Sequence, residues 1–484
     1  MDRITPELSH LMRYVAWISR LGLAEEEAQQ ANRERDALLG SLYEKGAKSA
    51  FMGSKVYTGR LSPGCMACGQ GEWSCIFINS LCTADCTFCP MDKSRSRDFE
   101  PVAGELTFGD PDAYVEYLDR FGFSGIGFSG GEPLLAFDKV RLFIEKIRQR
   151  FGGEPYVWMY TNGDLVDEKT LTVLREIGLD EIRFNICARD YSLDRVELAR
   201  QHLDTVSVEI PAVPEDFERV KECLVQMGRI GVDHLNLHQL VATEHNYIEL
   251  AKRDYTILRP EAFRECPVFE SEMMALRLLG HALDNQIDLS VHYCSHVYMA
   301  RFQNLASRKR AGALAREGFE RISKAGYISR TSARDTLGRL EEIVRVWRHD
   351  GVSDELWSLD SSLPELSFHH SLLSAIDLDG IQVRLQYFES DLVSRRDADV
   401  VQEIEIDADH RAYVKRWPVM EGVDASPAEL DRILRLLIVH EDKVPPRDQK
   451  VRAPENAHEI ELGSGVLRDL AGWERLPTGF PVIS

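Results

Sequence analysis

Between residues 75 and 239, short apolar runs typical of buried strands alternate with longer stretches of helical spacing. The apolar runs predict strands at 75–79, 125–128, 156–160, 181–186, 205–210 and 233–237. The stretches between them predict helices near 111–121, 137–150, 168–177, 192–202 and 215–230. Repeated strand–helix units favour a parallel sheet with right-handed crossovers, so we expect an α/β fold. A further helix near 268–285 and a strand at 287–292 follow.

The flanking regions have different patterns. Apolar residues at helical spacing near the start predict an N-terminal helical region over 1–55, followed by a cysteine-containing loop over 56–74. The α/β domain spans 75–340, and its last part, 299–340, reads as a basic helical extension. Most such charge runs are solvated faces, and the alternative is a cradle for an anionic ligand. Alternation over 366–420 and a helix at 426–439 predict a small α+β domain over 341–484.

Composition narrows the class of protein. The chain has 484 residues, 44% hydrophobic and 28% charged, which is typical of a soluble globular protein. A net charge of −21 argues against a general affinity for nucleic acid or anionic membranes. We see no apolar run long enough to span a bilayer and no signal peptide. The ten cysteines are clustered, which favours metal ligation in a reducing cytoplasm over disulfides.

The densest chemistry lies in one loop directly after the first predicted strand. Cys82, Cys86 and Cys89 follow a C-x3-C-x2-C spacing. Thiolates suit iron–sulfur clusters, and three of them leave one iron of a four-iron cluster without a protein ligand. A zinc knuckle is the alternative, although a zinc site requires a fourth ligand close by.

This loop, with Phe88 before its last cysteine, resembles the signature of the radical S-adenosylmethionine (radical SAM) superfamily. The stretch Gly130-Gly131-Glu132-Pro133 after the second predicted strand resembles that family's second motif. The resemblance implies a partial (β/α)6 barrel, a [4Fe–4S] cluster on the three cysteines, and S-adenosylmethionine bound to the open iron. A narrower similarity, over about 60–315, is to a little-characterised group related to pyruvate formate-lyase activating enzyme.

The resemblance also implies which residues bind S-adenosylmethionine. Gly130, Gly131 and Glu132 are expected to shape the site of its methionine end, and Asn185 lies where the family places a polar residue on the ribose. Thr161 and Asn162 follow the third predicted strand, at the edge where such sheets bind ligands. For each, the alternative is an ordinary turn or core polar residue.

A second metal site is expected from Cys65 and Cys68, a C-x2-C pair flanked by glycines. We assign Cys294 as a distant ligand of this site, while Cys75 is either a ligand or a core residue. The metal group is an auxiliary iron–sulfur cluster, a four-thiolate iron or a zinc ion, and a redox dithiol is the weaker alternative. His292 and His296 flank Cys294, and a structural role is favoured for both.

The implied activity is reductive cleavage of S-adenosylmethionine to a 5′-deoxyadenosyl radical that abstracts hydrogen from an unidentified small molecule or peptide. An electron donor such as flavodoxin or ferredoxin is the implied partner. The alternatives are a glycyl-radical activase, a peptide-modifying enzyme and a non-catalytic iron–sulfur binding protein. A zinc-stabilised nucleic-acid binder is disfavoured by the acidic charge.

Overall fold

The computed structural model describes residues 6–433, apart from 52, 92–98, 105, 259–265, 300–301, 303, 324, 377–379, 397–398, 407–409, 420–421, 427–428 and 431–432. The chain divides into two compact units, and among the described residues those before Asn304 belong to unit 1 and those from Asn304 belong to unit 2. Most of the predicted helix 426–439 lies outside the described residues.

Unit 1 is built on an 11-stranded sheet in the order β1-β2-β13-β10-β9-β8-β7-β6-β3-β4-β5. Its middle part is parallel throughout. The parallel strands are β3 (Trp73–Asn79), β6 (Gly125–Gly130), β7 (Tyr156–Thr161), β8 (Glu181–Phe184), β9 (Thr205–Pro211), β10 (His234–His238) and β13 (Ser290–Cys294). The strand–helix alternation of the sequence therefore predicts the parallel sheet correctly.

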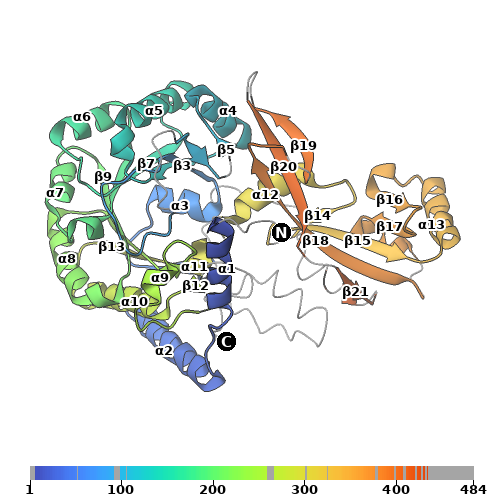
Figure 1. Ribbon diagram of the computed structural model, residues 1–484, viewed down its shortest axis with the longest axis horizontal. Coiled ribbons are helices and arrows are strands. Elements are labelled where there is room, and N and C mark those ends of the chain that lie inside the picture. The colour runs from blue at the N-terminus through green and yellow to red at the C-terminus, as the bar shows by residue number, and fades with distance from the viewer. Residues whose placement is uncertain are drawn as a thin grey trace. The chain divides into compact units, whose positions relative to one another are not determined.

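Helices connect these strands and cover the outside of the curved sheet (Figure 1). They are α4 (Pro111–Phe121), α5 (Phe137–Phe151), α6 (Glu168–Glu176), α7 (Asp194–Arg200), α8 (Phe217–Ile230) and α10 (Phe269–Asp284). Each presents an apolar face to the sheet; α5, for example, buries Val140, Phe143, Ile144 and Ile147. Short 3-10 turns follow three strands: η1 (Pro133–Ala136), η2 (Ile186–Arg189) and η3 (Pro214–Asp216).

One helix lies on the inside of the sheet instead. The segment predicted as a loop over 56–74 contains helix α3 (Pro63–Gln70), which contacts β3, β6 and β7. Figure 1 shows α3 within the ring of strands. The Ser62 side chain caps its first turn by accepting from the Cys65 N–H, and Gly71 ends it in a left-handed conformation. The helix contains only small or flexible side chains after Pro63, which lets it sit deep in the sheet's hollow.

Strand alternation decides which side chains reach that hollow. On β3, Ser74 bonds to Tyr114 of α4 on the outer side. Cys75 and Phe77, of opposite parity to Ser74, line cavities on the inner side. The inner face of the sheet is therefore the one that collects candidate functional groups.

The N-terminal region is helical as predicted, with α1 (Pro6–Ile18) and α2 (Glu25–Glu44). It also contributes two strands that the sequence pattern does not reveal, β1 (Lys48–Ala50) and β2 (Lys55–Tyr57). Strand β2 pairs antiparallel with β13, and the short strands β4 (Val102–Ala103) and β5 (Leu106–Thr107) extend the other edge. After β10 come β11 (Val241–Ala242), α9 (Tyr247–Leu250) and β12 (Cys266–Pro267), and α11 (His296–Tyr298) follows β13.

In its described residues, unit 2 is an antiparallel sheet with two α-helices, as the α+β expectation states. Its elements are α12 (Asn304–Ala315), β14 (Arg321–Ile322), β15 (Ile328–Arg334), α13 (Leu337–His349), β16 (Trp357–Asp360), β17 (Glu365–Phe368), β18 (Gln382–Val393), β19 (Val400–Glu405), β20 (Arg411–Pro418) and β21 (Val423–Ala425). The boundary between the two units lies before Asn304, whereas the sequence predicts a domain boundary after residue 340. The boundary lies earlier because β14 and β15 belong to the sheet of unit 2.

The prediction of a basic helical extension over 299–340 is wrong beyond Ala315. The alternating sequence Ile328–Arg334 forms the central strand β15, and sheet pairing there replaces helical order. Arg330 pairs with the buried carboxylate of Glu320 at 2.7 Å, and Arg416 pairs with the same group at 2.6 Å. These arginines neutralise an internal charge.

None of the helices in the described part of the chain is long and apolar enough to cross a membrane.

Candidate functional site

Two cavities lie on the inner face of the unit 1 sheet. The first has a volume of about 410 Å³ and opens at the carboxyl ends of the parallel strands. Its lining brings together most of the residues predicted from the sequence to bind cofactors: Cys82, Cys86, Phe88, Cys89, Gly130, Gly131, Thr161, Asn162 and Asn185. The carboxyl edge of a parallel sheet is where such folds bind ligands, so the position agrees with the expectation.

The cysteine loop is held in place by the segment that follows β10. The Asn246 side chain, which is buried, donates to the carbonyl oxygen of Phe88 at 3.1 Å and to that of Val241 at 3.0 Å. The Phe88 ring packs against an apolar cluster that includes Tyr14 of α1 and Tyr247 of α9. Sequence analysis missed Asn246, because nothing in its local pattern distinguishes it from a turn residue.

Two donors point at the first cysteine of the loop. The Ala84 N–H lies 3.4 Å from Cys82 Sγ, and Asn162 Nδ2 lies 3.8 Å from the same sulfur. Asn162 Nδ2 also donates to Thr83 Oγ1 at 2.7 Å. Hydrogen bonds to a cluster sulfur tune its reduction potential, so Asn162 is placed to act on a thiolate at Cys82.

The glycine pair is required by close backbone packing. A Cβ on Gly131 would lie 1.9 Å from the Leu81 carbonyl oxygen, and one on Gly130 would lie 2.3 Å from that of Asn79. Gly130 also has φ +122°, which favours glycine. The N–H groups of Gly131 and Glu132 donate to Asn79 O and Leu81 O at 2.9 and 2.6 Å. The motif therefore fixes the chain that leads directly into Cys82.

Glu132 is fully buried and does not line the first cavity. Its Oε1 accepts from the Leu134 N–H at 3.1 Å and from Thr161 Oγ1 at 2.9 Å, and its Oε2 accepts from the Asn162 N–H at 2.7 Å. Burial raises the pKa of this carboxyl group, and the bonds from Asn162, Leu134 and Thr161 oppose the rise. Glu132 thus ties the end of β7 to the glycine loop.

The first cavity fits the expected cofactors in two respects. The three loop cysteines face one hollow, and the side-chain oxygen of Asn185 in its wall is buried without a hydrogen-bond partner among the described residues. An unpaired buried oxygen is costly unless a ligand donates to it. Within the described ranges, no three His, Cys, Asp or Glu side chains already stand close enough to share a single metal ion. The argument that the first cavity fits these cofactors therefore depends on which residues line it and on their chemistry.

The second cavity, of about 250 Å³, lies beside α3. It gathers all four cysteines predicted for a second site: Cys65 and Cys68 from α3, Cys75 from β3 and Cys294 from β13. Cys75, which the sequence leaves as either a ligand or a core residue, lies in the wall of this cavity. Burial raises the pKa of the Cys68 thiol to about 12 and that of the Cys294 thiol to about 11. A metal must therefore displace thiol protons to bind here.

The two histidines that flank Cys294 in the sequence, His292 and His296, are not part of the lining of the second cavity. The ring of His292 contacts Asn236 Oδ1 through Nδ1 and the Arg60 carbonyl oxygen through Nε2, each at 2.7 Å. These contacts agree with the structural role favoured for His292.

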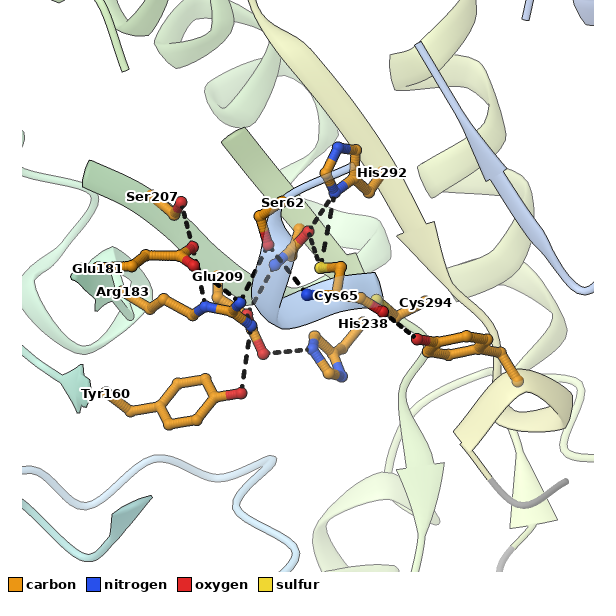
Figure 2. Close-up of polar contacts among 12 residues, drawn as sticks. Ser62, Cys65, Tyr160, Glu181, Arg183, Ser207, Glu209, His238, His292 and Cys294 are labelled. Carbon is orange, nitrogen blue, oxygen red and sulfur yellow. Dashed lines mark hydrogen bonds and ion pairs between the residues drawn. The ribbon is translucent and has the colours of Figure 1, made fainter. Parts of the chain in front are cut away.

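A buried charge network lies beside the two cavities, and two of its members, Glu209 and His238, line both. Arg183 donates to both oxygens of Glu181, at 2.9 and 3.0 Å, and to Glu209 Oε2 at 2.9 Å. Glu209 also accepts from His238 Nε2 and Asn236 Nδ2, both at 2.7 Å (Figure 2). Burial raises the pKa of Glu209, but Arg183 and His238 lower it by more, so it stays ionised. Its members come from three neighbouring strands, β8, β9 and β10, so no local spacing in the sequence reveals the network.

Comparison with known proteins agrees with the family resemblance seen in the cysteine loop and the glycine motif. The family described as the Radical SAM superfamily matches residues 76–242. A protein of Methanocaldococcus jannaschii, whose name proposes it as a glycyl-radical enzyme activating enzyme, is 27% identical over 310 residues, covering 61% of this chain and 80% of that protein. A GTP 3′,8-cyclase of Aquifex aeolicus is 31% identical over 150 residues, which are 30% of this chain and 43% of that enzyme.

Solved structures show lower similarity. SuiB of Streptococcus suis, bound to S-adenosylmethionine, is 10% identical with a TM-score of 0.34, covering 46% of this chain and 50% of SuiB.

Proposed function

This chain belongs to the radical SAM superfamily, and from that premise we propose that it is an enzyme that cleaves S-adenosylmethionine reductively and abstracts hydrogen from a substrate. The observation that carries the proposal is the lining of the first cavity. Cys82, Cys86 and Cys89 face the same hollow as the glycine pair and Asn185. The superfamily's cofactors, a [4Fe–4S] cluster and S-adenosylmethionine, are the groups this lining would hold.

When bound, these cofactors supply one electron and a sulfonium whose C–S cleavage gives a 5′-deoxyadenosyl radical. The three loop cysteines would supply thiolate ligands, and Asn185 Oδ1 would accept a hydroxyl donor such as a ribose. Glu132 and the glycine pair would hold the loop and the strand ends in register. Phe77, Ile210 and Leu240 keep the cavity mainly apolar, which favours exclusion of water from a radical.

The substrate is a small molecule or a peptide in this proposal, and the electron donor is a protein of the flavodoxin or ferredoxin class. A cytoplasmic setting is supported by the clustering of the ten cysteines, which favours metal ligation in a reducing compartment over disulfides. Binding of nucleic acid is not part of the proposal, because the net charge is −21.

The test is anaerobic reconstitution with iron and sulfide, followed by reduction and incubation with S-adenosylmethionine. We expect 5′-deoxyadenosine, measured by mass spectrometry, from the wild type and from Cys223→Ala, whose altered residue lies on α8 and lines neither cavity. Cys82→Ala should form none. Equal product from Cys82→Ala and Cys223→Ala would refute the assignment.

A second candidate, activation of a glycyl-radical enzyme, is favoured by the 27% identical relative and its printed name. It predicts that the hydrogen comes from a protein glycine. The reconstituted enzyme would be incubated with a cell extract whose proteins carry α-deuterated glycine. Deuterium in the 5′-deoxyadenosine supports this candidate, and unlabelled product formed in the extract excludes it.

A further inference from the structure

We propose that the second cavity binds a second [4Fe–4S] cluster through four thiolates, those of Cys65, Cys68, Cys75 and Cys294, with Lys55 as its internal counter-charge. The inference concerns a site distinct from the one that carries the proposed function. It rests on the convergence of the cysteines, the isolation of Lys55 and the size of the hollow.

The convergence requires two features of the fold. Cys75 on β3 and Cys294 on β13 lie at opposite ends of the parallel part of the sheet, and both line the same cavity. Helix α3 brings Cys65 and Cys68 to that cavity from inside the sheet. Helix α3 can lie this close to the sheet only with glycine at position 64, because a Cβ on Gly64 would lie 2.5 Å from Arg183 Nη2. Four thiols on three separate elements therefore share one hollow.

Lys55 gives independent evidence for an anionic occupant. It is fully buried, its Nζ lies 2.7 Å from Cys294 Sγ, and the same atom lies 4.5 Å from the centre of the Tyr298 ring. In the part of the chain that the structure describes, no carboxylate lies within ion-pair distance of this ammonium group. An unpaired buried charge costs several kcal/mol, so a negative group in the cavity would offset it.

The neighbouring charges do not provide that compensation. Glu181 and Glu209 both bond to Arg183, and Glu209 also bonds to His238. A cluster held by four thiolates is anionic, because its irons offset only part of the negative charge of the sulfurs. Such a group would sit directly against the ammonium of Lys55.

The size of the hollow favours a cluster over a single ion. Four thiolates around zinc, each at about 2.3 Å, bring their sulfurs to within roughly 4 Å of one another and leave no cavity. Here the cavity that the four cysteines line has a volume of about 250 Å³, and no three ligating side chains of the described ranges stand close enough to share one ion. A multi-iron cluster takes the same four ligands at a wider spacing.

Four thiolates leave no iron open, so this cluster would exchange electrons and would not bind substrate. The two cavities share a wall formed by Phe77, Ser129, Tyr160, Glu209 and His238. One layer of side chains would therefore separate the two clusters.

The test uses the full chain with Cys82, Cys86 and Cys89 all changed to Ala, reconstituted anaerobically with iron and sulfide. We expect about four irons per chain, against about eight in the wild type. After reduction, its electron paramagnetic resonance spectrum should be that of a [4Fe–4S] cluster and should not change when S-adenosylmethionine is added. Failure of S-adenosylmethionine cleavage in the wild type would leave this result intact, so the two proposals fail separately.

Further changes in this triple variant make the ligand assignment testable. Adding Cys65→Ser and Cys68→Ser should remove the remaining iron, while adding Cys223→Ser should retain it. Circular dichroism confirms that each variant is folded. A folded triple variant without iron, one holding a single zinc, or one whose iron survives Cys65→Ser and Cys68→Ser would overturn the proposal.

The role of Lys55 has its own readout. In the triple variant, Lys55→Met should make the reduction potential of the cluster more negative, because the cation stabilises the reduced, more anionic state. Lys55→Arg, which keeps the charge, should restore the potential. Equal potentials in Lys55→Met and Lys55→Arg would refute the counter-charge assignment.

Discussion

The substitution Glu132→Gln tests how the first cavity is held together. The carboxylate is fully buried and accepts from two backbone N–H groups and one hydroxyl, at Leu134, Asn162 and Thr161. In the glutamine variant the side-chain oxygen can keep the bonds from Leu134 and Thr161. The amide NH₂ would then face the Asn162 N–H, which loses its acceptor.

One charge-assisted bond is worth about 1.5–3 kcal/mol, and a buried donor left unpaired costs a similar amount. We therefore expect Glu132→Gln to lower the local opening free energy at the end of β7 by about 2–3 kcal/mol. Hydrogen exchange of peptides that cover 156–165, followed by mass spectrometry, measures this directly. Because Asn162 also bonds toward Cys82, formation of 5′-deoxyadenosine should fall as well.

The control is Glu145→Gln, on the exposed face of α5, which should leave both measurements unchanged. Exchange at 156–165 that is the same in Glu132→Gln as in Glu145→Gln would show that the buried carboxylate does not hold the two loops. That result would refute the positioning role.

Three further predictions concern single residues of unit 1. Gly131→Ala should reduce 5′-deoxyadenosine formation by about 100-fold, because the Leu81 carbonyl must move by more than an ångström. The control Gly153→Ala, at a position with open space around it, should leave the rate unchanged. Equal rates in the two variants would contradict the packing argument. Asn162→Leu should make the potential of the first cluster more negative in a redox titration, through loss of a donor to Cys82, and an unchanged potential would exclude that contact. Burial raises the pKa of Glu272 to about 7, from 4.5. Its stabilising contribution is therefore full below pH 4.5 and lost as the pH rises through 7, by about 3 kcal/mol. Urea unfolding at pH 5 and 8 should show this loss in the wild type and not in Glu272→Gln; equal losses in both would contradict it.

The fold was predictable where local pattern and tertiary packing agree. Helix α4 has the predicted bounds 111–121, because Asp110 caps it, Pro111 begins it and Gly122 ends it. The strand predicted at 287–292 lies at Ser290–Cys294, and this shift brings Cys294 into the sheet. Helix α3 was missed because it is short and glycine-rich, although Ser62, Pro63 and Gly71 are start and stop signals that identify it.

The candidate site was predictable in its ligands and less so in their surroundings. Cysteine spacing pointed to Cys82, Cys86 and Cys89, because ligands of one loop are close in sequence. Lys55 and Glu209 act through partners that are distant in the chain, so no local spacing reveals them. Glu132 belongs to the predicted motif, but its carboxylate bonds to the N–H groups of Leu134 and Asn162 and does not face the cavity. The direction in which a side chain points cannot be read from the motif.

The central claim is that three loop cysteines hold a cluster whose fourth iron accepts S-adenosylmethionine. Electron–nuclear double resonance of the reduced Cys65→Ser/Cys68→Ser variant, with S-adenosylmethionine labelled with ¹⁵N at the amino group and ¹⁷O at the carboxylate, tests it most directly. The account predicts coupling of both labels to the cluster iron in this variant and no coupling once Cys82→Ala is added. A reduced cluster whose spectrum shows neither label would contradict it.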